Sequence, residues 1–206
     1  METTRGQVEV LVGLDEAGVG PAWGSVWACA VHLPSEADAP VELRDSKKLT
    51  ERARDRVRGA LLTTACYGLG EVTQDEIDTL GLGEARVLVF ERALEDLVKR
   101  HPNLSPTRLV VDGTMFRPWR SIPYECVPKA DQTIPCVSAA SVLAKTTRDA
   151  QVIAACDADE SLQARYGLRK NKGYLSRQHV DGIRAHGYHA LHRRSYRIRA
   201  LEETRE

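Results

Sequence analysis

Short apolar stretches alternate along this chain with longer segments in which apolar residues recur every three or four positions. Residues 8–14 and 25–33 are short and rich in Val, Leu, Trp and Ala, which predicts two strands joined by a turn. Residues 66–72 and 108–111 predict two more strands, and a brief one is expected around 124–127. We therefore expect several short strands in one sheet.

Helices are predicted between these strands by the 3.6-residue spacing of apolar residues and by capping residues. They are expected after Thr50, after Thr73, over 82–97, over 138–156 and from Ser176 to Gly187. Because strands and helices interleave, the pattern predicts an α/β fold with a mixed sheet.

The length and composition indicate one domain. A chain of 206 residues with 42 % apolar content can bury a sizeable core. We expect a catalytic core over 7–157, a basic helical extension over 158–200 within the same compact unit, and a tail over 201–206. No run of 18 apolar residues is present, so no membrane span is expected.

The cysteines and the N-terminus bear on the compartment. Five cysteines form no CxxC pair, which favours reduced thiols over a disulfide or zinc framework. The first residues lack the apolar core of a signal peptide. We therefore expect a cytoplasmic protein.

Charge is distributed unevenly although its sum is zero. Residues 71–96 hold eight acids and two bases, whereas residues 161–200 hold ten Lys or Arg and one acid, Asp181. A basic surface of this kind suits a polyanion such as nucleic acid, although a solvated pair of basic helices explains the charge equally well.

Carboxylates follow two of the predicted strands. Asp15 and Asp112 each end an apolar strand, and Asp131 precedes the long helix. Ligands bind at the carboxyl ends of strands in open α/β sheets, and acids gathered there repel one another unless cations intervene. Oxygen ligands favour Mg²⁺ or Mn²⁺ over zinc. Glu16 joins this site only if the strand bends or ends there; for any single Asp, a turn or helix cap is the commoner role.

Six blocks of sequence follow one another between residues 8 and 200. They are LDEAGVGP from Leu14, RDSKKLT from Arg44, VVDG from Val110, KAD from Lys129 with IPCVSAASVLAKTTRD from Ile134, YGLRKNKGY from Tyr166 and HRRSY from His192. In this order the blocks resemble the ribonuclease HII family, the type 2 ribonucleases H.

The resemblance implies a ribonuclease H-like fold, in which helices flank a mixed five-stranded sheet and a helical extension follows. It implies cleavage of RNA in RNA–DNA hybrids, leaving 3′-hydroxyl and 5′-phosphate ends, and incision 5′ to single ribonucleotides in duplex DNA. Asp15, Glu16, Asp112 and Asp131 match the metal-binding carboxylates, with Mg²⁺ or Mn²⁺ as the cofactor, and Tyr174 matches a tyrosine that packs on the sugar. We expect a monomer that binds these two substrates.

Basic side chains in the same blocks are expected to track phosphates, which positions a duplex without reading its sequence. These residues are Lys47, Lys48, Lys145, Arg148, Lys170, Lys172, Arg193 and Arg194. The alternative for each is a solvated surface charge. For Lys47, Lys48 and the 169–172 group we favour phosphate binding, because they flank Gly, Ser or Tyr turns.

The segment Gly18-Val19-Gly20 departs from the family pattern, which has arginine in the middle, or lysine in ribonuclease HIII. Gly18 and Gly20 still allow the backbone to approach a ribose closely. Valine offers no donor to a phosphate, so we expect weaker binding at isolated ribonucleotides or a preference for longer RNA stretches.

Other functions remain open at this point. A metal nuclease of the same fold that cuts DNA would not need a 2′-hydroxyl, and a hybrid-binding protein would lack turnover. His186, His189 and His192 invite a zinc site, but they straddle a helix end at Gly187. Ser46, Ser138 and Ser141 have no histidine in their motifs to activate a nucleophile.

Overall fold

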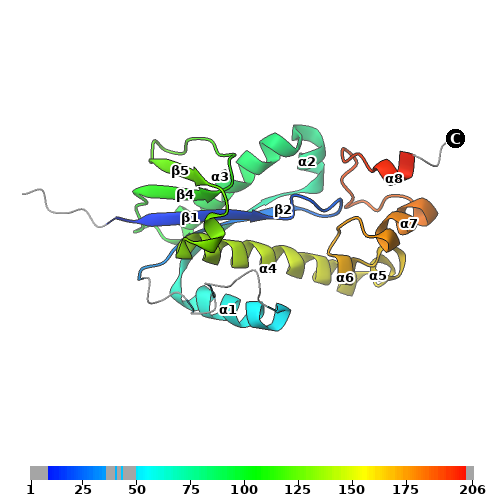
Figure 1. Ribbon diagram of the computed structural model, residues 1–206, viewed down its shortest axis with the longest axis horizontal. Coiled ribbons are helices and arrows are strands. Elements are labelled where there is room, and N and C mark those ends of the chain that lie inside the picture. Colours follow the sequence, from blue (N-terminus) through cyan, green and yellow to red (C-terminus); the bar gives the residue numbers. More distant parts are fainter. Residues whose placement is uncertain (1–8, 36–39, 41–42, 44–49, 203–206) are drawn as a thin grey trace, which may run out of the picture.

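A mixed five-stranded sheet forms the centre of the protein. The computed structural model describes residues 9–35, 40, 43 and 50–202 (Figure 1). The strand order is β3-β2-β1-β4-β5, with β1 antiparallel to β2, β2 antiparallel to β3, and β1, β4 and β5 parallel. The strands are β1 (Leu11–Ala17), β2 (Val26–His32), β3 (Cys66–Val72), β4 (Arg108–Asp112) and β5 (Tyr124–Val127). The predicted mixed α/β sheet is confirmed.

Helices cover both faces of this sheet (Figure 1). Helix α3 packs against β3 and β2 on one face, and α4 packs against β1 and β2 on the other, with α1 beside α4. The helices are α1 (Glu51–Thr64), α2 (Gln74–Leu80), α3 (Leu82–Arg100), the 3₁₀ turn η3 (Ala130–Gln132), α4 (Pro135–Ala158), α5 (Ser161–Tyr166), α6 (Leu168–Asn171), α7 (Arg177–His186) and α8 (Arg199–Glu202). None of the described helices combines the length and apolar character needed to cross a membrane.

Three helices begin at the N-cap residues that the sequence predicted. The Thr50 hydroxyl accepts from Ala53 N–H at the start of α1, and Thr73 and Glu76 form a complete capping box at α2. Ser176 caps α7 in the same way, and Gly187 ends it with a positive φ of 74°.

The apolar core extends into the C-terminal helices. Leu14 packs with Val89 and Phe90 under α3, and Cys29 packs with Leu143 under α4. A further cluster joins the loop after β1 to the C-terminal segments through Trp23, Val152, Cys156, Tyr166, Leu168 and Ile183. The loop between β1 and β2 is therefore packed against residues that lie far along the chain.

Strand β1 continues further than the sequence pattern predicts. The expected end at residue 14 coincides with the last pairing to β4, Leu14 with Val111. Pairing with β2 nevertheless continues through Asp15, Glu16 and Ala17, because the backbone ladder does not depend on the polarity of the side chains. The two acids thus lie in a strand that extends beyond the end of its parallel neighbour.

Candidate active site

Asp15 and Asp112 are neighbours at the end of two parallel strands. The register pairs Leu14 with Val111, so the next residue in each strand is one of these two acids. Asp15 is 7 % exposed and accepts a hydrogen bond from the Glu16 backbone N–H, with 2.7 Å between the atoms. Ser141 on α4 provides a second hydrogen bond.

The Asp15 carboxyl is destabilised in its charged form. Burial, together with the nearby charges of Glu16 and Asp112, raises its pKa to about 7, even though the hydrogen bonds from Ser141 and Glu16 oppose the shift. Burial is the main cause of this shift, and perturbed carboxyl groups of this kind are common at functional sites.

Glu16, the next residue of β1, meets Arg86 from α3. Arg86 Nε donates to Glu16 Oε1 over 3.1 Å, and Nη2 of the same arginine donates to that oxygen as well. Burial raises the pKa of Glu16, with a further contribution from Asp112, against the opposing effect of Arg86. Within the described part of the chain, the buried Oε2 atom has no hydrogen-bond partner.

Asp131 is held close to Asp112 by the turn that precedes α4. The backbone N–H of Ala130 donates to Asp112 Oδ1 over 2.8 Å, and Ser138 Oγ donates to the Asp131 carbonyl. Asp131 is 3 % exposed. Among the described residues, however, no three His, Cys, Asp or Glu side chains are grouped tightly enough to hold a metal ion. The structure therefore brings the four acids to one end of the sheet without closing a ligand cage.

The glycine loop lies beside these acids and beside Tyr174. Gly18 has a φ of 92°, which suits glycine rather than a residue with a side chain. A Cβ atom at Gly20 would lie 3.3 Å from Cε1 of Tyr174, and Ala22 N–H donates to the Gly173 carbonyl over 3.0 Å. Tyr174 is 49 % exposed, so its ring and the loop share a surface that a ligand can reach.

The residues expected to contact phosphates fall into four groups. Lys47 and Lys48 lie outside the described residues. Lys170 and Arg194 are exposed, as a phosphate contact requires. Lys145 pairs with Asp149 at 3.0 Å, and Lys172 Nζ donates to the Arg169 carbonyl, so these two are engaged within the protein.

Arg148 and Arg193, which were also expected to contact phosphates, are turned inward. Their exposed fractions are 1 % and 0 %. Arg148 donates to the Trp23 carbonyl over 3.1 Å, and Arg193 donates to carbonyls of the glycine loop. A sequence motif gives the charge of a side chain but not whether tertiary packing turns it inward.

Two residues at the site were missed by the sequence analysis. Arg86 is one of only two bases in the acidic stretch 71–96, which was the available signal that it has an acidic partner. Ser141 was considered only as a nucleophile that has no histidine in its motif. Its place on the face of α4 toward β1 depends on the tertiary structure.

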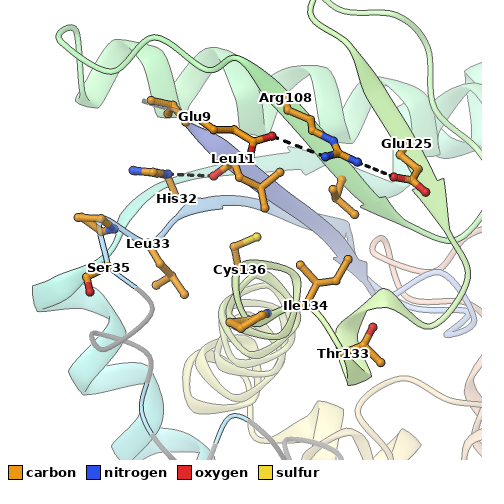
Figure 2. A pocket seen from close by; sticks show the side chains of 14 residues that line it. Glu9, Leu11, His32, Leu33, Ser35, Arg108, Glu125, Thr133, Ile134 and Cys136 are labelled. Carbon is orange, nitrogen blue, oxygen red and sulfur yellow. Dashed lines mark hydrogen bonds and ion pairs between the residues drawn. The ribbon is translucent and has the colours of Figure 1, made fainter. Parts of the chain in front are cut away.

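A cavity at the opposite end of β1 and β4 is not part of this site. It has a volume of about 570 Å³ and is lined by residues at the start of β1 and β4, including Leu11 and Arg108. Figure 2 shows Arg108 between Glu9 and Glu125, and His32 bonded to the Leu11 carbonyl. The four candidate acids do not line it.

Comparison with known protein families shows to which family the chain belongs. The profile described as Ribonuclease HII matches residues 12–198. The chain belongs to the ribonuclease HII family. A ribonuclease HII from Neisseria meningitidis serogroup C (strain 053442) is 39 % identical over 185 residues, which are 89 % of this chain and 90 % of that protein.

Solved structures agree with the fold. Ribonuclease H2 from Pyrococcus horikoshii OT3 matches with a TM-score of 0.71 and 26 % identity, covering 94 % of this chain and 97 % of that one. Bst-RNase HIII in complex with Mn²⁺ matches with a TM-score of 0.69 and 22 % identity, covering 87 % and 63 %. As a ribonuclease HII, the protein is a hydrolase that cleaves RNA in RNA–DNA hybrids.

Proposed function

We propose that this ribonuclease HII uses Asp15, Glu16, Asp112 and Asp131 to bind Mg²⁺ or Mn²⁺, and that it also incises duplex DNA 5′ to embedded ribonucleotides. The observation that carries the proposal is the Asp15 carboxyl. It is 7 % exposed, and burial together with Glu16 and Asp112 raises its pKa to about 7. A divalent cation offsets such a concentration of negative charge.

The donor set fits a hard cation. All four side chains offer carboxylate oxygens, the ligands that Mg²⁺ and Mn²⁺ prefer. The buried Oε2 of Glu16, which lacks a hydrogen-bond partner among the described residues, supports the same assignment. When bound, divalent cations supply an activated water and stabilise charge on the scissile phosphate. Manganese in Bst-RNase HIII is consistent with this choice.

The remaining residues orient the substrate. Ser141 holds Asp15 in place, and the glycine loop presents its backbone to the ribose, where the 2′-hydroxyl separates RNA from DNA. The exposed ring of Tyr174 packs on the adjacent sugar. Phosphates are contacted by Lys145, Lys170, Lys172 and Arg194, and by Lys47 and Lys48 outside the described residues. Lys145 and Lys172 exchange their present partners for the phosphate.

Val19 changes the preference among ribonucleotide substrates. Its side chain is partly buried and packs against the core under α3, so it provides no donor to a phosphate. We infer that single embedded ribonucleotides are bound more weakly than stretches of RNA.

A cleavage assay with three labelled duplexes tests the proposal. An RNA–DNA hybrid, a DNA duplex with one ribonucleotide and an all-DNA duplex are incubated with Mg²⁺ or Mn²⁺. We expect cleavage of the first two only, and none in EDTA. Cleavage of the all-DNA duplex would identify a DNA nuclease instead, and binding without cleavage would identify a hybrid-binding protein.

The variant Asp15→Asn tests whether hydrolysis needs the Asp15 carboxylate. It keeps the shape of the side chain and removes its charge, so turnover should be lost while hybrid binding stays measurable. Asp181→Asn is the matched control, because Asp181 is exposed on α7 and paired with Arg184. Full turnover in Asp15→Asn would remove Asp15 from the mechanism.

A further inference from the structure

Arg193 directs its donors at the glycine loop. Nε donates to the Gly24 carbonyl over 2.8 Å, Nη1 to the Val19 carbonyl over 3.1 Å, and Nη2 to the Gly18 carbonyl over 2.6 Å. The side chain is fully buried, and no carboxylate among the described residues forms a salt bridge with it. A buried guanidinium needs its donors to be hydrogen-bonded, and most of the donors of Arg193 are directed at carbonyl oxygens of the loop.

Tyr196 reinforces the same contact. Its hydroxyl donates to the Val19 carbonyl over 2.5 Å and accepts from Arg193 Nη1 over 2.8 Å. The guanidinium of Arg193 lies 5.1 Å from the centroid of the Tyr196 ring. Two side chains of the HRRSY segment therefore converge on one peptide group of the loop.

The backbone of residues 191–193 also forms hydrogen bonds with the loop. Arg193 N–H donates to the Ala22 carbonyl over 2.9 Å, Gly24 N–H donates to the Leu191 carbonyl over 2.8 Å, and Trp23 pairs with His192 in an isolated bridge. The loop is thus supported along its length by residues 191–196, which come from the far end of the chain.

These contacts determine which way the peptide groups of the loop face. A trans peptide is planar, and its C=O and N–H point in opposite directions. The carbonyls of Gly18 and Val19 face Arg193, so the N–H groups of Val19 and Gly20 face away from it. Gly20 is exposed beside the ring of Tyr174, and the two N–H groups therefore face the surface that a ribose can reach.

We propose that Arg193, assisted by Tyr196, is a positioning residue for ribonucleotide recognition: it fixes the peptide planes of residues 18–20 so that their N–H groups meet the ribose 2′-hydroxyl. This inference rests on the proposed reading of the 2′-hydroxyl by the glycine loop. Arg193 itself touches no substrate.

The test measures selectivity rather than activity alone. Binding is measured by fluorescence anisotropy in EDTA, where no hydrolysis competes, for a DNA duplex with a short tract of ribonucleotides and for the all-DNA duplex of the same sequence. Repulsion between the carboxylates and phosphates weakens binding of both duplexes, so the ratio of their Kd values isolates the 2′-hydroxyl.

Arg193→Lys keeps the charge, but its single compact ammonium cannot reproduce the planar fork whose three nitrogens contact the Gly18, Val19 and Gly24 carbonyls. We expect its preference for the ribonucleotide duplex to fall toward one, with affinity for the all-DNA duplex within about two-fold of the parent. Tyr196→Phe should reduce the preference partially. Arg197→Gln should leave it unchanged, because Arg197 is 79 % exposed and pairs only with Glu202 among the described residues.

The following results would contradict the inference. A folded Arg193→Lys that keeps the parental preference overturns it, as does a parent that shows no preference in EDTA. Should Arg193→Lys lose its thermal unfolding transition, Tyr196→Phe decides: an unchanged preference there overturns the inference. A parent that cleaves no ribonucleotide substrate with Mn²⁺ contradicts the proposed function itself, which is a separate result.

Discussion

Nε2 of His192 lies 2.9 Å from Nε2 of His179, and both rings are buried in the C-terminal part of the protein. His189 N–H donates to Nδ1 of His192 over 2.7 Å, so that atom carries no proton. The proton of neutral His192 is therefore on Nε2 and is donated to His179. His179 in turn donates from Nδ1 to the Tyr174 carbonyl over 2.9 Å. Two neutral imidazoles thus anchor the backbone of Tyr174.

This arrangement predicts that the contribution of His192 to stability is lost in mild acid. Burial, with further contributions from His179, His189 and Arg194, lowers the pKa of His192 to about 4, although a backbone hydrogen bond with His189 opposes the shift. The unfolded chain binds a proton near pH 6.5, about 2.5 units higher. Between these values only the unfolded state is protonated at His192, so the contribution of His192 to the free energy of unfolding falls as pH falls, by on the order of 3 kcal/mol in total. The raised pKa of Asp15 contributes in the opposite direction over the same pH range.

Urea unfolding at several pH values between 7 and 4.5 checks this prediction. Because it lacks the contribution of His192, His192→Gln should gain stability relative to the parent as pH falls. His186→Gln serves as the control, because His186 is exposed at the end of α7, and it should retain the parental slope. If the free energy of unfolding depended on pH equally in all three proteins, the pKa of His192 would not be lowered in the native state, and the prediction would be wrong.

Val19→Arg should improve incision at single ribonucleotides. The substitution adds a guanidinium that donates to a phosphate, a contact worth about 1.5–3 kcal/mol for charged groups. We expect kcat/KM on the single-ribonucleotide duplex to rise about ten-fold or more, with a smaller change on a long hybrid. Equal incision of the single-ribonucleotide duplex by the parent and the variant would contradict the role assigned to residue 19.

Gly70→Ala should destabilise the protein. A Cβ atom there would lie 2.1 Å from the Val89 carbonyl oxygen, because β3 and α3 approach closely. Overpacking of this kind costs about 1–3 kcal/mol. Gly59→Ala in α1 is the control: it meets no atom within 4 Å and should stabilise by about 0.5–1 kcal/mol. Urea midpoints measure both, and a neutral Gly70→Ala would contradict the close strand–helix contact.

The sequence predicted the elements that depend on local signals. The helices after Thr50, Thr73 and Ser176 begin where predicted, because an N-cap hydroxyl satisfies backbone donors of its own helix. The acids at the ends of β1 and β4 were found because strand ends and glycines mark them locally. The placement of Asp15 beside Asp112 then followed from parallel pairing.

Features that depend on tertiary packing were not predictable in this way. Arg193 and Arg194 are adjacent in the sequence and equally basic, yet one is fully buried against the glycine loop and the other is exposed. Glu16 was expected to share a site with Asp15 if the strand ended. The strand continues instead, because β2 still pairs with it. Glu16 meets Arg86, yet it stays close enough to Asp112 for that charge to raise its pKa.

The central claim is that Asp15 and Asp112, together with Glu16 and Asp131, bind a divalent cation. The most direct measurement is a Mn²⁺ titration followed by electron paramagnetic resonance in the parent, Asp15→Asn, Asp112→Asn and the control Asp181→Asn. The account predicts that the parent and the control bind Mn²⁺ alike, and that each of the other two loses affinity by about ten-fold or more. Parental affinity in both Asp15→Asn and Asp112→Asn would contradict it.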